Sequence, residues 1–435
     1  MMAGTMIDVS PVIDRAILVA APHPDEPQDL VDEHLEELER LVDTAGAEVC
    51  GTLVQRVPSP HSAFYIGSGK VDQLRLLAET SGATLIVFDE NLTPGQGSAL
   101  EKRLGIRVMD RTEVILDIFA LRARSAESRL QVELAQLQYL RTRLKRMWTH
   151  LSRTQGGIGT RGPGETQLET DRRIIDRRIA RLRRELKHIQ KSRETRRQGR
   201  SDTLQFTLVG YTNAGKSSLL KALSGTDVFV EDRLFATLDS ATRSVDLGDG
   251  YTALITDTVG FIRKLPHHLV ASFRATLEEV QGADLLLHVI DASSPGWQHQ
   301  VDAVNDVLAS LDLLDQPTLL VFNKIDQLTH AEEQALAART EAMHEASVLT
   351  SVREPHGLDS LLAALRSQAQ ATRPTVVVTL PVTDGRLLAE AYREGEVLER
   401  VDGAKTIRIT ARVPLAVLGR WRRHPDVSVA EQDAA

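Results

Sequence analysis

The stretch Phe206-Thr-Leu-Val-Gly-Tyr-Thr-Asn-Ala-Gly-Lys-Ser217 decides the fold class of this 435-residue chain. Its first four residues form an apolar run typical of a buried strand, and the next eight match the pattern Gly-x4-Gly-Lys-Ser. A helical run follows from Ser218. Gly210 and Gly215 permit a tight loop whose backbone amides surround phosphate groups at a helix N-terminus. The stretch therefore predicts a phosphate-binding loop in an α/β domain.

This loop supplies most of the candidate nucleotide ligands. We expect Lys216 to reach the β- and γ-phosphates and to take part in catalysis, and the Ser217 hydroxyl to ligate Mg²⁺. The backbone of the loop and the first helical turn complete the predicted phosphate contacts, which come from Gly210, Tyr211, Thr212, Asn213, Ala214, Gly215 and Ser218.

A second element, Leu254-Ile-Thr-Asp-Thr-Val-Gly260, places an aspartate 41 residues beyond Lys216. Asp257 ends an apolar strand, and we expect it to hold Mg²⁺ through a water. The Gly260 amide is expected to contact the γ-phosphate during catalysis. Alone, a strand ending in Asp-x-x-Gly is more often a turn, and the preceding phosphate-binding loop gives it this interpretation. The remaining nucleotide-binding residues of the segment are Thr258 and Val259.

A switch threonine is expected between these two elements. Thr237, in Leu234-Phe-Ala-Thr-Leu-Asp239, is the candidate. It would ligate Mg²⁺ and contact the γ-phosphate, so that its loop becomes ordered only in the triphosphate state. Thr242 lies nearby and is the competing candidate.

A third element selects the base. The buried-strand run Thr318–Phe322 leads into Asn323-Lys-Ile-Asp326, the guanine signature of GTPases. A carboxylate only accepts hydrogen bonds, so Asp326 can receive both donors on the guanine edge, a pair that adenine lacks. Asn323 is expected to pin the neighbouring loop, and Lys324 to cover the base. A backbone amide of Thr350-Ser351-Val352 is expected to meet guanine O6.

The residue after Gly260 is Phe261, where many small GTPases carry a glutamine that orients the attacking water. Phenylalanine has no polar atom for that role. We therefore predict slow intrinsic hydrolysis that a bound partner accelerates.

Composition and charge indicate a protein of the reducing cytosol that meets a polyanion. Hydrophobic residues form 42% of the chain, no run of 18 uncharged apolar residues occurs, and Cys50 is the single cysteine. We thus predict no membrane span and no internal disulfide. The net charge is −8, yet residues 121–200 hold 22 Lys and Arg against 8 Asp and Glu. Such a basic segment favours a polyanionic partner, although the charge alone also fits a solvated helix.

The basic segment has the periodicity of two long helices. Apolar residues recur at spacings of three and four from Leu130 to Met147, and again from Ile175 to Ile189, so the helices should pack as an antiparallel hairpin. Residues 155–164 hold five glycines and a proline, which exclude a helix. We predict a basic helical hairpin at 116–200 with a flexible, Gly-rich tip loop at 155–164.

The fold class is α/β and multidomain. Alternating patterns predict a small N-terminal α/β domain at 1–115, with strands at 16–20, 48–57, 63–66, 84–88 and 106–109. The P-loop GTPase domain is expected at 203–371. A small C-terminal α+β domain at 375–435 should contain strands at 375–380 and 404–411, a helix at 385–394 and a short helix from Pro414. Ile66-Gly-Ser-Gly-Lys70 lacks the spacing of a second phosphate-binding loop and is interpreted as a turn into a helix.

Several motifs resemble the HflX family of ribosome-associated GTPases. The similarity runs from Tyr65 to about Leu365 and is most specific around the Gly-rich tip. It is carried by the segments 129–137, 148–152, 157–171, 234–239 and 257–262. The resemblance implies a stress-related factor that binds the large ribosomal subunit and its RNA near the peptidyl-transferase centre and in several cases splits ribosomes.

The resemblance also implies RNA contacts at the hairpin, made mainly by neutralising phosphates. The candidates are Arg153, Gly157 and Arg161 at the tip and Arg141, Arg143, Lys145 and Arg146 in the first helix. K⁺ near Asn213 is an alternative to a simple turn role for that residue. Family members also show ATP binding attributed to the N-terminal domain, but residues 1–120 contain no phosphate loop for it.

We therefore expect a cytoplasmic, partly ribosome-associated monomer that binds GTP or GDP with Mg²⁺, without DNA as a partner and without stable membrane insertion; peripheral membrane contact is left open. One alternative is an RNA-modification or ribosome-assembly GTPase, which should prefer free RNA or precursor particles. Another is a signalling GTPase whose hairpin is a protein-docking coiled coil. Glutamine in place of Arg141, Arg143, Lys145 and Arg146 would then leave partner binding intact and insensitive to salt. The Gly-rich tip is poorly suited to protein docking, which counts against this alternative.

Overall fold

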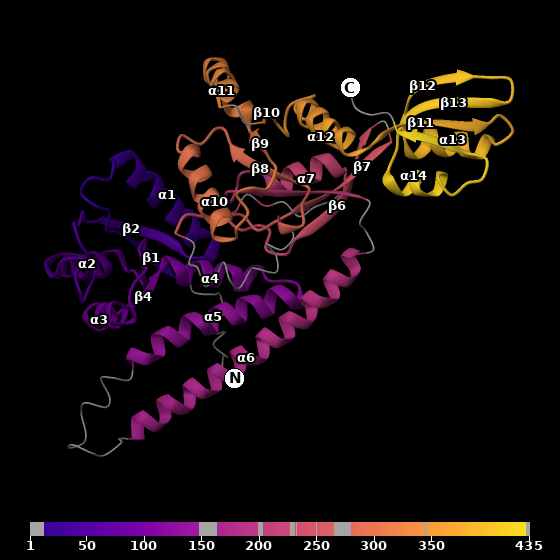
Figure 1. Cartoon of the computed structure of the whole chain (residues 1–435). Helices are drawn as coiled ribbons and strands as arrows, with labels where there is room; N and C mark the ends of the chain where they lie inside the picture. Colours follow the sequence, from indigo (N-terminus) through magenta and orange to yellow (C-terminus); the bar gives the residue numbers. More distant parts are fainter. Residues whose placement is uncertain are drawn as a thin grey trace, which may run out of the picture. The chain divides into compact units, whose positions relative to one another are not determined.

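The computed structural model describes residues 13–147, 163–198, 203–226, 231, 233–248, 250–264, 280–343 and 346–431 (Figure 1). Tertiary contacts divide the chain into two compact units. The first unit runs to His188 and also includes Arg233–Phe235, and the second contains most of the chain from Ile189 onward. The first unit thus holds the N-terminal domain and most of the long helices, and the second holds the nucleotide-binding and C-terminal domains.

The first unit contains a four-stranded parallel sheet in the order β2-β1-β3-β4. Parallel neighbours need a crossover, which explains the alternation of strands and helices in the sequence. Ile17, Ile86 and Phe88 are fully buried in its core. The elements are β1 (Arg15–Ala20), α1 (Gln28–Ala45), β2 (Glu48–Val54), α2 (Ser68–Ser81), β3 (Leu85–Phe88), α3 (Pro94–Leu104), β4 (Arg107–Asp110) and α4 (Arg111–Arg122).

Two details of this domain differ from the prediction. Residues 63–66 form an irregular segment rather than a strand, because Tyr65 adopts a φ of 67° and makes only an isolated bridge to His61. The predicted boundary at residue 115 falls inside α4, which packs on α1 and so continues the N-terminal domain. Ile66-Gly-Ser-Gly-Lys70 is a turn into a helix, since α2 begins at Ser68.

Two long helices follow, α5 (Ala126–Met147) and α6 (Pro163–Gln198). They pack through a small cluster in which Leu134, Ile179 and Leu182 are buried. Leu140 is 42% exposed, so the predicted apolar seam is shorter than the periodicity suggested. α6 begins inside the predicted tip loop, because a proline at the first helical position gives up no intrahelical hydrogen bond. Residues 155–162 of that loop lie outside the described residues.

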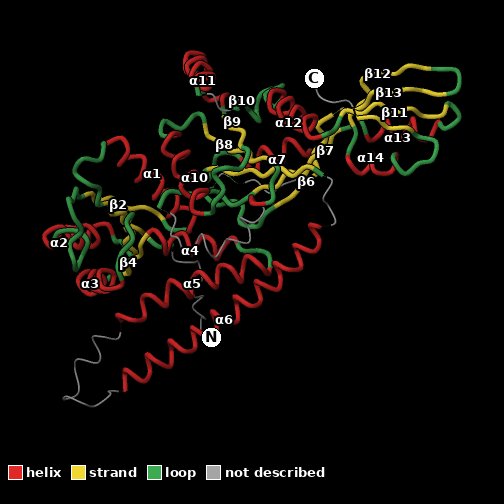
Figure 2. The backbone as a smooth tube through the Cα atoms, in the orientation of Figure 1, coloured by secondary structure: helices red, strands yellow, loops and turns green. Residues whose placement is uncertain are grey.

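The second unit contains a six-stranded sheet in the order β10-β9-β8-β5-β7-β6, in which only the β6–β7 pair is antiparallel (Figure 2). The parallel strands bring their carboxyl ends to one edge, where ligands bind in such folds. The elements are β5 (Leu204–Gly210), α7 (Lys216–Ser224), β6 (Ala241–Gly248), β7 (Tyr251–Asp257), β8 (Leu285–Asp291), α10 (Trp297–Ser310), β9 (Thr318–Asn323), α11 (His330–Ala342), β10 (Ser347–Leu349) and α12 (Asp359–Thr372).

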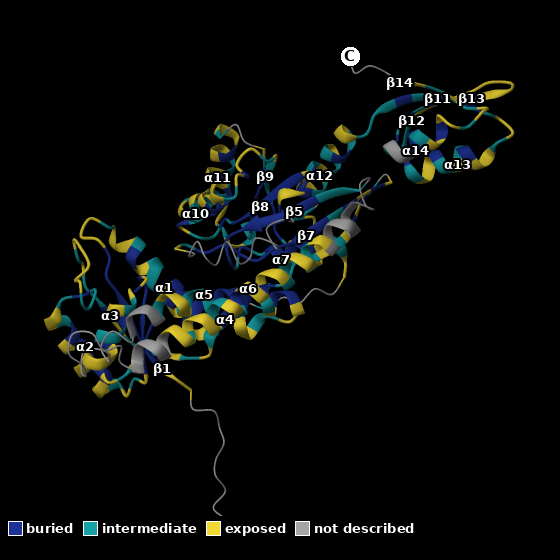
Figure 3. Ribbon diagram, turned by 60° about the horizontal axis from the view of Figure 1, so that its bottom comes forward, coloured by how far each residue is buried: buried dark blue, intermediate teal, exposed yellow. Residues whose placement is uncertain are grey.

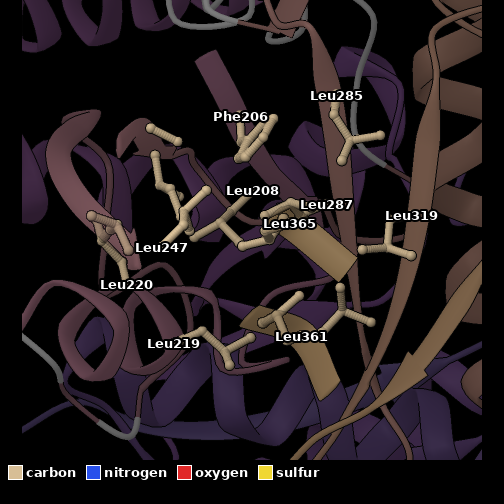
Figure 4. Packing of buried hydrophobic residues seen from close by; sticks show 14 of the residues in the cluster. Phe206, Leu208, Leu219, Leu220, Leu247, Leu285, Leu287, Leu319, Leu361 and Leu365 are labelled. Atoms are coloured by element: carbon tan, nitrogen blue, oxygen red, sulfur yellow. The ribbon is translucent and has the colours of Figure 1, made fainter. Parts of the chain in front are cut away.

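Helices cover both faces of this sheet, as β9 shows. Leu319 and Val321 belong to the cluster that packs with α7 and α12 (Figure 4). Phe322 belongs to the cluster on the other face, where its ring meets the Trp297 ring edge-on with centroids 5.2 Å apart. Strands buried on both faces have continuous apolar sequences, which is why Thr318–Phe322 was recognisable as a strand.

The C-terminal domain has an antiparallel sheet in the order β12-β13-β11-β14 with two helices. Val376, Ile409 and Trp421 are buried in its core. β12 was missed by the sequence because it is an edge strand whose residues 398–402 are exposed and lack apolar alternation. The short β14 was also missed. The elements are β11 (Thr375–Pro381), α13 (Gly385–Glu394), β12 (Glu396–Asp402), β13 (Thr406–Arg412), α14 (Leu415–Trp421) and β14 (Ser428–Glu431).

Tyr251, the first residue of β7, joins the C-terminal domain to the sheet. Its hydroxyl donates to Glu396 Oε2 at 2.7 Å, and the Arg373 guanidinium carbon lies 3.9 Å from its ring centroid. Arg373 also donates to the carbonyl oxygens of Gly250 and Glu394, each at 3.3 Å. Burial and the Glu396 carboxylate raise the pKa of Tyr251, so the hydroxyl stays neutral and remains a donor.

The strands of the sheets are more buried than the long helix α6. Figure 3 shows β5 and β8 as buried strands, whereas α6 displays a largely exposed surface. Cys50 lies half-buried in β2, and its Sγ is 3.4 Å from the carbonyl oxygen of Ala16. Among the described helices, none has the length and apolarity needed to cross a bilayer.

Candidate nucleotide-binding site

The turn from β5 into α7 forms the phosphate-binding loop, and two glycines are required in it. Gly210 has a φ of 147°, and a Cβ built there would lie 2.2 Å from the carbonyl oxygen of Val289 on the adjacent β8. Gly215 has a φ of 98°, and a Cβ built there would lie 2.3 Å from Asn323 Nδ2. Any side chain at either position would separate this loop from its neighbours.

Lys216, the first residue of α7, points back into this loop. Its Nζ donates to the carbonyl oxygens of Gly210 at 3.1 Å and Tyr211 at 2.7 Å. Burial lowers the pKa of Lys216 to about 8, while the Asp257 carboxylate acts in the opposite direction. The ammonium group is thus desolvated, which increases its attraction for an anion placed in the loop.

Three oxygen-bearing side chains converge beside Lys216. Ser217 Oγ donates to Asp257 Oδ2 at 2.6 Å, and it lies 2.7 Å from Thr237 Oγ1. Asp257 Oδ1 is buried and has no hydrogen-bond partner within the described part of the chain. Burial raises the pKa of Asp257, and the nearby Lys216 partly counters it. Two hydroxyls and an incompletely satisfied carboxylate form an oxygen donor set that suits Mg²⁺.

The structure separates the two threonine candidates. Thr237 is in the cluster with Ser217, whereas Thr242 lies on β6, where its Oγ1 is 2.9 Å from Oγ1 of Thr256 on β7. Thr242 is therefore engaged in the sheet and not in the site.

The loop after β9 supplies the candidate base pocket. Ser351 Oγ donates to Asp326 Oδ1 at 2.7 Å and fixes that carboxylate. Lys324 has a φ of 65°, and its Nζ forms an ion pair of 2.6 Å with Asp291 Oδ2 at the end of β8. Asp291 did not stand out in the sequence, because it ends a strand without a recognisable motif and lies 33 residues before its partner. It holds the aliphatic stem of Lys324 in place.

Of the three backbone amides that were candidates for the contact with guanine O6, the hydrogen bonds leave one. The Thr350 amide donates to the Phe322 carbonyl oxygen at 2.7 Å, and the Ser351 amide donates to the Gly357 carbonyl oxygen at 3.0 Å. Val352 is the residue of this trio whose amide has no hydrogen-bond partner among the described residues. The predicted contact therefore falls on Val352, and the Ser351 side chain orients Asp326 instead.

Three stretches of the chain, which include the residues of this site, match models of known protein families. Residues 32–120, 122–200 and 205–324 match the family models described as GTP-binding GTPase N-terminal, GTP-binding GTPase middle region and 50S ribosome-binding GTPase. A GTPase HflX of Magnetococcus marinus is 45% identical, with 95% of this chain and 96% of that protein covered. This chain belongs to the HflX family of GTPases.

A second HflX relative and one solved structure are also similar to this chain. The GTPase HflX of Escherichia coli strain K12 is 44% identical, with 91% of this chain and 92% of that protein covered. A crystal structure described as an SsGBP and GDP complex has a TM-score of 0.47 and 24% identity over 82% of this chain and 99% of that one. As an HflX-family member the chain is a GTPase that binds GTP and GDP, typically with Mg²⁺.

One of the predicted RNA contacts of this HflX-family chain, Arg143, makes contacts inside the first unit. Its side chain is 16% exposed, and its Nη2 lies 2.6 Å from Asp110 Oδ2. Its guanidinium carbon also lies 4.3 Å from the Tyr139 ring centroid. Arg143 is thus an internal contact of the first unit. The Arg141 side chain is half-exposed, and its Nε lies 3.2 Å from Asp176 Oδ1.

The side chains of the remaining RNA candidates are not described. Arg153, Gly157 and Arg161 lie outside the described residues, and Lys145 and Arg146 belong to α5, of which only the backbone is described at these two positions. α6 offers exposed cations that the sequence did not single out. Arg177, Arg183 and Lys187 are exposed and form no ion pair with any described residue. The spacing of the buried Ile179 and Leu182 could have predicted which of these face outward.

Proposed function

We propose that this GTPase binds the large ribosomal subunit and its RNA through α5, α6 and the Gly-rich segment between them, and that it splits or rescues ribosomes under stress. The observation that supports this best is that Arg177, Arg183 and Lys187 are exposed on the Arg-rich part of α6 and form no ion pair with any described residue. Exposed cations without acidic partners attract phosphates strongly. The family description "50S ribosome-binding GTPase" is consistent with such a partner.

In this proposal the phosphates lie in the 210–218 loop against Lys216, and Asp326, Lys324 and the Val352 amide hold guanine. Ser217 and Thr237 would hold Mg²⁺, with Asp257 acting through a water. Bound Mg²⁺ supplies charge neutralisation between the β- and γ-phosphates. The protein's own contribution is positioning, because Asn323 Nδ2 donates to the Ala214 carbonyl oxygen at 3.0 Å and ties the base pocket to the phosphate loop.

Hydrolysis without the ribosome is slow in this proposal. Phe261 occupies the position where many GTPases orient the attacking water, and it is 1% exposed with no polar side-chain atom. A ribosomal group would complete the site. GTP must then favour the ribosome-binding state over the free state, since equal affinity for both nucleotide states would shift no equilibrium.

Sucrose-gradient sedimentation tests the proposal. The full chain is mixed with 50S subunits and with 70S ribosomes in the presence of GDP or a non-hydrolysable GTP analogue. We expect co-sedimentation with 50S subunits, stronger with the GTP analogue, and a transfer of 70S material into subunit peaks. The triple variant Arg177→Gln, Arg183→Gln, Lys187→Gln should co-sediment at least about tenfold less, because three phosphate contacts are lost.

A matched control removes the same charge elsewhere. Arg40, Arg75 and Lys102 are exposed cations of the N-terminal domain, and their triple glutamine variant should co-sediment like the unmodified chain. A protein that stays at the top of the gradient with both nucleotides contradicts ribosome binding. Preferential binding to free RNA or precursor particles would instead support an assembly or RNA-modification role.

A further inference from the structure

The segment 260–263 after β7 is fastened directly to the phosphate-binding loop. The Phe261 amide donates to the Gly210 carbonyl oxygen at 3.0 Å, and the Thr212 amide donates to the Phe261 carbonyl oxygen at 2.7 Å. A side chain adds to these backbone contacts: the Arg263 amide donates to Tyr211 Oη at 2.9 Å. Tyr211 is 7% exposed, so this hydrogen bond is shielded from solvent. We call these three hydrogen bonds the closed contact.

The closed contact leaves no space for a γ-phosphate. A Cβ built on Gly260 would lie 2.7 Å from Thr212 Cα and 3.0 Å from Lys216 Nζ. Gly260 and Lys216 are the two groups predicted to contact the γ-phosphate. Because even one added carbon on Gly260 would lie too close to Thr212 and Lys216, a phosphate oxygen fits between Gly260 and Lys216 only if they move apart. The Thr212 amide, which the loop would offer to phosphate, is also occupied.

We propose that Tyr211 is a positioning residue that stabilises the closed contact and thereby sets the preference of this GTPase for GDP over GTP. Of the groups in these three hydrogen bonds, the Tyr211 hydroxyl is the one that belongs to a side chain. It accepts from Arg263, at the opposite end of the 260–263 segment from Gly260. GDP, which has no γ-phosphate, is compatible with the closed contact. GTP binds only after the segment has opened, and the Tyr211 hydrogen bond opposes that opening.

The size of the effect follows from linkage. A ligand that binds only the open state has its apparent affinity reduced by the fraction of open molecules. Removing a hydrogen bond of about 0.5–1.5 kcal/mol raises that fraction by about 2- to 13-fold when the closed state predominates. The affinity for GTP relative to GDP should rise by the same factor. This inference rests on the proposed roles of Lys216 and Gly260.

The test uses the full chain and the variant Tyr211→Phe, which removes only the hydroxyl oxygen. Dissociation constants for fluorescent GDP and for a fluorescent non-hydrolysable GTP analogue are measured with Mg²⁺. We expect the ratio of the two constants to shift at least twofold towards the GTP analogue. A smaller shift, or a shift towards GDP, overturns the inference. If neither nucleotide binds the unmodified chain, the proposed nucleotide site itself fails.

A control and a second measurement separate this role from a general loss of stability. Tyr251→Phe also removes a buried tyrosine hydroxyl from the same unit, and it should leave the ratio within twofold; an equal shift in both variants would contradict a specific role for Tyr211. In the unmodified chain, the Arg263 amide should exchange with deuterium more slowly with GDP than with the GTP analogue. Equal or reversed protection would overturn the closed contact as a nucleotide-sensitive element.

Discussion

Asn323 Nδ2 lies 3.0 Å from the carbonyl oxygen of Ala214, so the end of β9 directly holds the loop that begins α7. The two residues are 109 positions apart in the sequence. The other polar atom of this side chain, Asn323 Oδ1, is buried without a partner among the described residues. One side chain therefore fixes the phosphate loop and keeps an acceptor available beside the candidate base pocket.

Replacing Asn323 with alanine should weaken GDP binding about 5- to 30-fold. The substitution removes the hydrogen bond to the Ala214 carbonyl and leaves that oxygen unsatisfied, a loss of about 1–2 kcal/mol. Isothermal titration calorimetry with GDP measures the effect. Asn305→Ala on α10 is the matched control and should bind GDP as the unmodified chain does. Equal affinities for all three proteins would show that Asn323 has no part in the site.

Replacing Asp326 with asparagine should change which base is bound. The carboxylate accepts two donors from guanine, but an amide presents one acceptor and one donor group. GDP affinity should fall by about tenfold or more, since each lost charged hydrogen bond contributes about 1.5–3 kcal/mol. Xanthosine diphosphate, which has an oxygen where guanine has its amino group, should bind the variant better than the unmodified chain. Competition titrations decide this, and unchanged base preference would contradict the role of Asp326.

Asn213 has a φ of 61°, which supports a turn role, and the K⁺ alternative can be separated from it. Asn213→Gly should keep GDP affinity, because glycine adopts this conformation freely. Asn213→Ala should bind GDP several-fold more weakly, since alanine is strained in this conformation by about 1–2 kcal/mol. If Asn213 has only a turn role, the difference in GDP affinity between the two variants should be the same in KCl and in NaCl. A loss of GTP hydrolysis in both variants that occurs only in KCl would assign Asn213 to K⁺ instead.

The buried Lys216 should make the stability of the nucleotide-free protein depend on pH. Its pKa falls from 10.5 to about 8 on folding, so between these values the unfolded chain binds more protons than the folded chain. The free energy of unfolding therefore rises with pH across this window, by about 3 kcal/mol in total. Urea unfolding at pH 8, 9 and 10 should show this rise in the unmodified chain and a smaller one in Lys216→Met. Parallel pH profiles for the two proteins would refute the assignment.

The sequence predicted the parts of the site that are local in the chain. The phosphate loop and the guanine signature each occupy a few consecutive residues, flanked by strands buried on both faces. The Asp291–Lys324 ion pair was not predictable in this way, because it joins the ends of two neighbouring strands. The narrowing to Val352 likewise needed the hydrogen bond from Ser351 to Gly357.

Charged surfaces were predicted less well than apolar ones. The excess of Arg and Lys marked 121–200 as basic, but it could not show that Arg143 forms an ion pair with Asp110 while Arg177 is exposed and pairs with no described residue. Only the folded packing of α5 on the N-terminal domain separates these two arginines. The edge strand β12 escaped notice for a related reason, since an exposed strand has no apolar alternation to recognise.

The Tyr251–Glu396 hydrogen bond has a practical consequence for anyone who shortens this protein. A chain trimmed after Thr372 would expose a tyrosine that is otherwise 0% accessible and would remove both Glu396 and the stacked Arg373. β7 would then begin with an unanchored aromatic ring and end at Asp257. Kinetic constants from such a fragment would describe a damaged strand, so assays of nucleotide turnover belong on the intact polypeptide.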